Sequence, residues 1–213
     1  MNWLLRVFLN PLKCILTLLL MSATGLGATG LLLVPHSSLA QSSPPATTLP
    51  NLGTDQRQAR LRTLYDSLKK TQDPNEIDSV QREIWTIWLH HGNPEIDNLM
   101  SQVMTARRES NYEHAIALTD KVIELAPDYA EGWNQRATLH FLRESYEESL
   151  RDVAETLRLE PNHFGALSGR GLIRMRQGKP ALAIQNILEA LKVNPHLHER
   201  QLLKALGYSE TNT

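Results

Sequence analysis

The sequence predicts an all-α protein, an α-solenoid built from helix-turn-helix repeats, and three observations lead to this fold class. Pro127, Pro161 and Pro195 lie 34 residues apart on both steps, a period typical of stacked structural repeats. Several other columns of residues keep the same register. Hydrophobic residues make up 41% of the chain but aromatic residues only 6%, and Ala and Leu are frequent, which favours helix over strand.

Residues 1–40 are predicted to be a secretory signal peptide. Arg6 and Lys13 supply basic charge, a 21-residue apolar stretch follows, and small residues precede a cleavage point after Ala40. This pattern predicts export to the periplasm. The alternative interpretation is that the segment 12–34 is retained as an inner-membrane anchor, because 21 apolar residues can span a bilayer.

Residues 41–54 are predicted to be a flexible linker, because they are rich in Pro, Ser and Thr and poor in large apolar side chains. Cys14 is the single cysteine, so cleavage would leave a chain without disulfides, thiolate metal ligands or a thiol nucleophile. Of 22 basic and 23 acidic residues, cleavage removes two basic ones, which leaves a formal charge of −3. Such a mild charge argues against nucleic acid as a partner.

Residues 55–95 are predicted to form a divergent helical hairpin that packs on the first repeat. Its second helix has a clear start signal, with Asp73 as N-cap, Pro74 at the first helical position and Glu76 two positions further on. Its first helix carries an apolar face, which comprises Leu61, Leu64, Tyr65 and Leu68. Trp85 and Trp88 share one face of the second helix and are interpreted as packing residues, with an aromatic ligand surface as the alternative.

The repeated columns have physical roles that fit helical hairpins. Ala115, Ser149 and Ala183 are small where two helices must approach closely, and Ala137 and Gly171 serve the same contact from the opposite helix. The repeating columns are Leu99, Trp133 and Leu167; Tyr112, Tyr146 and Pro180; Ala115, Ser149 and Ala183; and Val122, Thr156 and Ala190. Gly178 is a plausible left-handed cap in the turn between paired helices.

This pattern resembles the tetratricopeptide repeat family, whose 34-residue unit is a helix-turn-helix. The resemblance covers residues 96–197 as the repeats 96–129, 130–163 and 164–197, and residues 198–213 are expected to form a cap helix and tail. The first repeat departs from the pattern, because Val103 stands where the later repeats have a small residue. His140 and Arg174 also replace an aromatic residue that is common in the family.

The sequence carries no recognisable catalytic, cofactor-binding or metal-binding constellation. His90 and His91 are adjacent and cannot face one metal ion from a helix, and no HExxH motif is present. No serine has a G-x-S-x-G setting, and the glycine-containing GRGL motif at 169–172 lies inside a predicted helix. We therefore expect a protein that is not an enzyme and has no cofactor.

The family resemblance implies that the first helix of each repeat lines a concave groove. By register, the groove residues are Met100, Met104, Arg107, Asn134, Thr138, Phe141, Ser168, Leu172 and Met175. Flexible thioether side chains suit an extended peptide or an amphipathic helix. Some members of the family grip a carboxylate with Lys and Asn, but Met100 and Met104 stand at the corresponding places, so that clamp is absent.

The resulting expectation is a non-enzymatic protein-protein interaction module of the cell envelope that binds a peptide or partner protein in its groove. It would have no membrane contact after cleavage. A second interpretation is an assembly scaffold held at the inner membrane by the uncleaved segment. A third is an accessory subunit of an envelope enzyme.

Overall fold

The computed structural model describes residues 53–208, and all the regular elements among them are helices. The predicted all-α class is confirmed. The helices are α3 (Thr54–Lys70), α4 (Pro74–Leu89), α5 (Pro94–Arg108), α6 (Tyr112–Leu125), α7 (Ala130–Leu142), α8 (Tyr146–Leu159), α9 (Phe164–Arg176), α10 (Pro180–Val193) and α11 (Arg200–Ala205). The predicted signal peptide, nearly all of the predicted linker and the end of the predicted tail lie outside the described residues.

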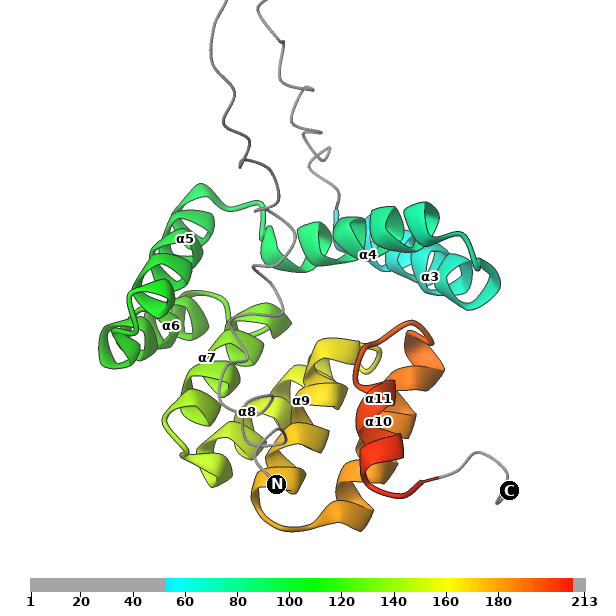
Figure 1. Ribbon diagram of the computed structural model, residues 1–213. Coiled ribbons are helices and arrows are strands. Elements are labelled where there is room, and N and C mark those ends of the chain that lie inside the picture. The colour runs from blue at the N-terminus through cyan, green and yellow to red at the C-terminus, as the bar shows by residue number, and fades with distance from the viewer. Residues whose placement is uncertain (1–52, 209–213) are drawn as a thin grey trace, which may run out of the picture. The chain divides into compact units, whose positions relative to one another are not determined.

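The helices from α5 to α10 form hairpin pairs that stack side by side (Figure 1). The pairs are α5–α6, α7–α8 and α9–α10, and they meet where α6 packs on α7 and α8 packs on α9. Their boundaries follow the 34-residue period, since α7 begins at Ala130 and α9 at Phe164. This is the stacked architecture that the period predicts.

Close helix crossings hold each pair together, and small residues make them possible. A Cβ atom at Gly171 would lie 2.8 Å from Cγ1 of Ile187 and 3.3 Å from the carbonyl oxygen of Ala183. In the preceding pair, the hydroxyl of Ser149 donates a hydrogen bond to the carbonyl oxygen of Ala137 at 2.7 Å. The predicted contact between these small residues is therefore confirmed.

The turn inside each pair repeats one backbone conformation. Ser110, Glu144 and Gly178 have positive φ values of 59°, 61° and 70°, and these residues also lie 34 positions apart. In each turn the next N–H donates to a helix carbonyl five residues earlier at 2.9 Å, which caps the helix end. The prediction of a left-handed cap at Gly178 is confirmed, and the other two turns adopt the same conformation without glycine.

The turns that follow the three helix pairs, here called the inter-pair turns, contain the repeated prolines. Pro127, Pro161 and Pro195 each lie two residues beyond the end of a helix, as predicted. The inter-pair turns are residues 126–129, 160–163 and 194–199. Trp133, just after the first of them, donates its indole N–H to the carbonyl oxygen of Pro127 at 2.9 Å. This bond ties the start of α7 to the turn that precedes it.

The hairpin α3–α4 begins and turns as the sequence predicts. Asp73 is the N-cap of α4, because its carboxylate accepts a hydrogen bond from the N–H of Asn75 at 3.0 Å, and Pro74 is the first helical residue. Guanidinium groups hold the two helices together: Arg60 binds Glu83 at 2.6 Å, and Arg57 donates to the carbonyl oxygen of Ile87.

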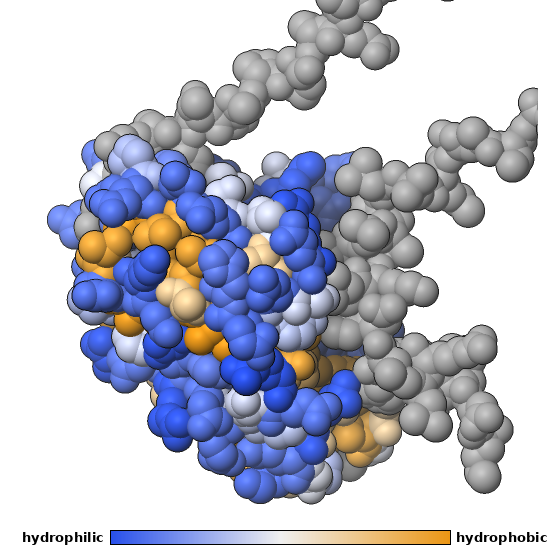
Figure 2. Space-filling view, turned by 90° about the vertical axis from the view of Figure 1, so that its left-hand side faces the viewer, coloured by the Kyte–Doolittle hydropathy of each residue, from blue (hydrophilic) through white to orange (hydrophobic). Residues whose placement is uncertain are grey.

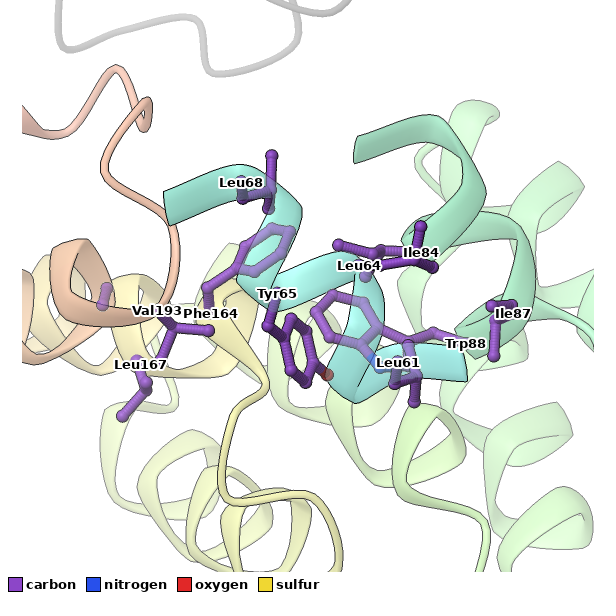
Figure 3. Packing of buried hydrophobic residues seen from close by; sticks show 11 residues of the cluster. Leu61, Leu64, Tyr65, Leu68, Ile84, Ile87, Trp88, Phe164, Leu167 and Val193 are labelled. Atoms are coloured by element: carbon purple, nitrogen blue, oxygen red, sulfur yellow. The ribbon is translucent and has the colours of Figure 1, made fainter. Parts of the chain in front are cut away.

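This hairpin contacts the first repeat, as predicted, where the hydroxyl of Tyr129 donates to the carbonyl oxygen of Trp88. Its position extends further than predicted, because it lies across the inter-pair turns and buries its apolar face against α9 and α10 (Figures 1 and 3). The buried members of this cluster are Leu61, Leu64, Tyr65, Leu68, Ile84, Ile87, Trp88, Phe164, Leu167, Ala190 and Val193. The hairpin thus joins the start of the described chain to its third helix pair.

This placement leaves the end of the stack at α5 and α6 with apolar surface. Figure 2 shows that end, where hydrophobic side chains gather among hydrophilic ones. Leu99 and Ile116 are only partly buried there, and Leu125 is 52% exposed. At the opposite end, the short helix α11 packs Leu203 against α10.

Candidate functional site

The predicted groove residues all come from α5, α7 and α9, the first helices of the three pairs. The helices α7 and α9 are in contact, which places their equivalent residues near one another. Six of the nine residues are partly exposed: Met104, Arg107, Thr138, Phe141, Leu172 and Met175. The other three are buried.

The buried residues require a correction to the predicted groove. Met100 is only 3% exposed and packs with Ile96 and Val122 in an apolar cluster, so it supports the fold and offers no surface. Asn134 and Ser168 are also buried. Their side chains bond within the protein, Asn134 to the carboxylate of Glu131 at 3.0 Å and Ser168 to its own helix.

The remaining polar groove residues also have partners in the protein. Arg107 donates to the amide oxygen of Gln135 at 2.9 Å, and burial lowers the pKa of its guanidinium. Thr138 donates to the carbonyl oxygen of Asn134 at 3.0 Å. Phe141 packs partly between α7 and α8, with its ring centroid 5.9 Å from that of Tyr146. The accessible part of this face is therefore chiefly apolar, from Met104, Leu172 and Met175.

A buried polar network beside this face was not predicted from the sequence. Glu131 is 1% exposed and accepts hydrogen bonds from Asn134 and Gln135, while His163 Nε2 lies 2.9 Å from its Oε2 atom. His163 also caps α9, because its Nδ1 accepts from the N–H of Ala166 at 3.1 Å. Since Nδ1 accepts, Nε2 carries the proton that is donated to Glu131.

The same histidine connects the network to the hairpin. The rings of Trp88 and His163 stack with centroids 3.8 Å apart and planes inclined by 12°. Trp85 packs edge-on against Trp88 at 5.0 Å and against Phe164 at 5.8 Å. Both tryptophans therefore pack in the protein, as predicted, although against the boundary of the second and third repeats rather than against the first.

Hydrogen bonds extend the hairpin interface along all three inter-pair turns. The hydroxyl of Tyr129 donates to the carbonyl oxygen of Trp88 at 2.9 Å, and Gln58 donates to Glu160 at 3.2 Å. At the third turn, His196 Nε2 donates to the carbonyl oxygen of Leu68 at 2.9 Å. Polar residues in turns gave no sequence signal for this role, because turn residues are ordinarily solvated.

Within residues 53–208, no three His, Cys, Asp or Glu side chains are grouped so as to hold a metal ion. Over the same range, no helix combines the length and hydropathy needed to cross a bilayer.

Comparisons with known proteins identify the kind of repeat. The chain is 36% identical over 183 residues to a TPR repeat-containing protein of Rhizobium etli, and this match covers 82% of the chain and 90% of the relative. It is 26% identical over 126 residues to the small glutamine-rich tetratricopeptide repeat-containing protein 2 of Saccharomyces cerevisiae, covering 54% of the chain and 36% of that protein. No protein-family model matches the chain.

A solved structure shows the same fold. It is the first TPR domain of Spaghetti (RPAP3) bound to the HSP90 peptide SRMEEVD, with a TM-score of 0.51 and 19% sequence identity. The match covers 53% of this chain and 90% of that one.

Proposed function

The chain belongs to the tetratricopeptide repeat proteins, and from this premise we propose that it is a non-enzymatic interaction module that holds an apolar-faced peptide or helix of a partner protein on the groove face of α5, α7 and α9. The fold supports protein-protein interaction as its general role. The RPAP3 domain, which shares the fold, was solved with a peptide bound, and this supports peptide capture.

One observation carries the choice of an apolar partner. The polar residues of the groove face are engaged by other groups of the protein, whereas Met104, Leu172 and Met175 remain partly exposed. Methionine side chains can repack around varied apolar groups, so this face suits a partner with a hydrophobic stripe. Because Arg107 is half-buried and bonded to Gln135, we expect the affinity to depend only weakly on salt.

We place this module in the cell envelope, because the first 40 residues have the three-part composition of a secretory signal. N-terminal sequencing of the mature protein tests this assignment: a start at Gln41 supports a free periplasmic module. An intact N-terminus in the membrane fraction would favour the inner-membrane scaffold instead.

The groove assignment is tested with a charged double variant. Met104→Glu with Leu172→Glu should abolish capture of the partner identified by crosslinking in the cell envelope, because burying a carboxylate against an apolar peptide is unfavourable. The matched control is Ala117→Glu with Ala154→Glu, which adds the same charge at exposed positions of α6 and α8. Helicity and melting temperature should stay nearly unchanged in both. Loss of capture in the control alone would show that the partner binds the opposite face.

A further inference from the structure

A pocket lies away from the groove residues, between the α3–α4 hairpin and the first two inter-pair turns. Its volume is about 300 Å³. The apolar residues that line it are Leu61, Ile87, Trp88 and Leu159. None of the nine predicted groove residues lines it.

The charges that line this pocket are unbalanced. Asp128, Glu131 and Glu160 supply three carboxylates, and Arg57 supplies one guanidinium. That guanidinium is already engaged, because it donates to the carbonyl oxygens of Ile87 and His91. Burial lowers the pKa of His91, so this ring is neutral at pH 7 and adds no positive charge. The pocket therefore has a negative potential, which a low-dielectric wall strengthens.

Glu160 is the most unusual of these groups. This residue is only 5% exposed. Its carboxylate accepts hydrogen bonds from neutral donors, the side-chain amide of Gln58 at 3.2 Å and the backbone N–H of Asn162 at 3.2 Å. A buried carboxylate is ordinarily paired with a cation or strongly hydrogen-bonded.

Two further polar groups lie behind the wall of this pocket. The hydroxyl of Tyr65 and the indole N–H of Trp88 are buried beside each other and near Glu160, without a hydrogen bond of ordinary geometry. The Glu160 carboxylate raises the pKa of Tyr65 further, after the larger effect of burial, which shows that the hydroxyl lies close to this pocket-lining group. Both atoms are inaccessible to solvent and Tyr65 does not line the pocket, so they lie behind its wall and hold no pocket ligand themselves.

We propose that this pocket binds an organic cation, the guanidinium or ammonium group of an arginine or lysine side chain or of a free small molecule of the same chemistry. The charged head would lie against Glu160 and Asp128, and the apolar wall would cover its methylene stem. This site is separate from the groove face, so it adds a second specificity to the module.

The experiment titrates the whole chain with three probes by calorimetry: argininamide, a blocked Ala-Ala-Arg-Ala-Ala peptide, and the same peptide with neutral citrulline in place of arginine. The cationic probes should bind, with affinity that falls as salt rises, and the citrulline peptide should not. A peptide that binds about tenfold more tightly than argininamide indicates a protein side chain as the natural source, because flanking backbone adds contacts. Equal affinities indicate a free small molecule.

Variants locate the binding. Glu160→Gln should weaken binding of the arginine peptide by about tenfold, because it removes the buried charge and keeps the shape. Gln58→Lys should abolish binding, since it places a tethered ammonium group in the pocket from an exposed helix position. Ala59→Lys is the matched control, because it adds the same charge to α3 outside the pocket and should leave affinity nearly unchanged.

The outcomes are distinct from those of the groove test. Equal binding of the citrulline peptide, or unchanged affinity in Gln58→Lys, would overturn the proposal. If Glu160→Gln lowers the melting temperature, two other variants still test the proposal: Gln58→Lys and Asp128→Asn. Asp128 is exposed at the rim of the pocket, so Asp128→Asn should weaken binding of the arginine peptide by about threefold. The groove variant Met104→Glu with Leu172→Glu should bind the arginine peptide normally.

Discussion

The stacked helix pairs and the α3–α4 hairpin are held in place by different kinds of contact. Within the pairs, small residues such as Gly171 and Ala183 let helices cross closely at intervals fixed by the 34-residue period. The hairpin is held by its apolar face on α9 and α10, by an aromatic stack on His163 and by hydrogen bonds to three separate turns. The pairs therefore depend on local shape, and the hairpin depends on surface that only the assembled stack provides.

Because the contacts differ, substitutions in the two regions should destabilise different parts of the protein. A change inside a helix crossing should disturb one pair and its neighbours. A change in the hairpin interface should release the hairpin while the pairs keep their fold.

Trp88→Ala should have the largest effect on stability. It removes a side chain that is 5% exposed and the stack on His163, and we expect a loss of about 3–5 kcal/mol in the free energy of unfolding. Urea unfolding measures the loss, and limited proteolysis between α4 and α5 reports release of the hairpin. Trp85→Ala, at a half-buried position, should cost less. Equal losses in the free energy of unfolding for the two variants would show that the stack of Trp88 on His163 is not the main contact.

Ala183→Leu should destabilise the third pair by about 1–3 kcal/mol, because a larger side chain overpacks a close helix crossing. Ala183 is fully buried and its carbonyl faces Gly171. Hydrogen exchange should show the loss of protection concentrated in α9 and α10. Ala181→Leu, at an exposed position of the same helix, is the control. If hydrogen exchange rises first in α3 and α4, the hairpin and the stacked pairs are more strongly coupled than their different contacts imply.

Glu144→Gly should stabilise the protein by about 0.5–1 kcal/mol, because a left-handed residue with a side chain is strained and glycine is not. The equivalent turn already has glycine at position 178. The gain should appear as a higher urea midpoint. Glu147→Gly, inside α8, should instead lower the midpoint, since glycine in a helix is unfavourable.

A small pH effect should come from His91 at the hairpin interface, where its ring lies 5.0 Å from that of Tyr129. Burial lowers the pKa of this imidazole below its ordinary value of 6.5. The unfolded chain therefore takes up the proton first as the pH falls, so the stabilisation is present above about pH 6.5 and is lost below it. His91→Asn should reduce the fall of the urea midpoint between pH 7.5 and 5.5, and His140, whose pKa burial also lowers, should account for part of the fall that remains. An unchanged pH dependence in His91→Asn would contradict this prediction.

The sequence predicted the helix pairs well because their determinants repeat along the chain. Prolines, small residues and helix starts recur at one period, so each repeat supports the interpretation of the next. The prediction failed for Met100, because the register gave its position on α5 but not its rotation toward Val122 and the first inter-pair turn.

The docking of the hairpin could not be read from the sequence in the same way. Its apolar faces were evident from Leu61 to Trp88, but the surface that receives them is assembled from turns far apart in the chain. The Glu131–His163 pair had no signal either, because isolated polar residues in a helical repeat are ordinarily exposed. Only the stack brings them together at 2.9 Å.

The hairpin changes how this repeat array is expected to fold. An array in which each unit contacts only its neighbours has local topology and can begin to fold at any repeat. Here, hydrogen bonds join Gln58 to Glu160, Gln81 to Asn194 and Leu68 to His196, over sequence separations of 102, 113 and 128 residues. These contacts form only after a long loop has closed, which raises the contact order and slows the final step. The stack can therefore assemble before the hairpin closes over it, and removal of the last helix pair would weaken the first hairpin of the described chain.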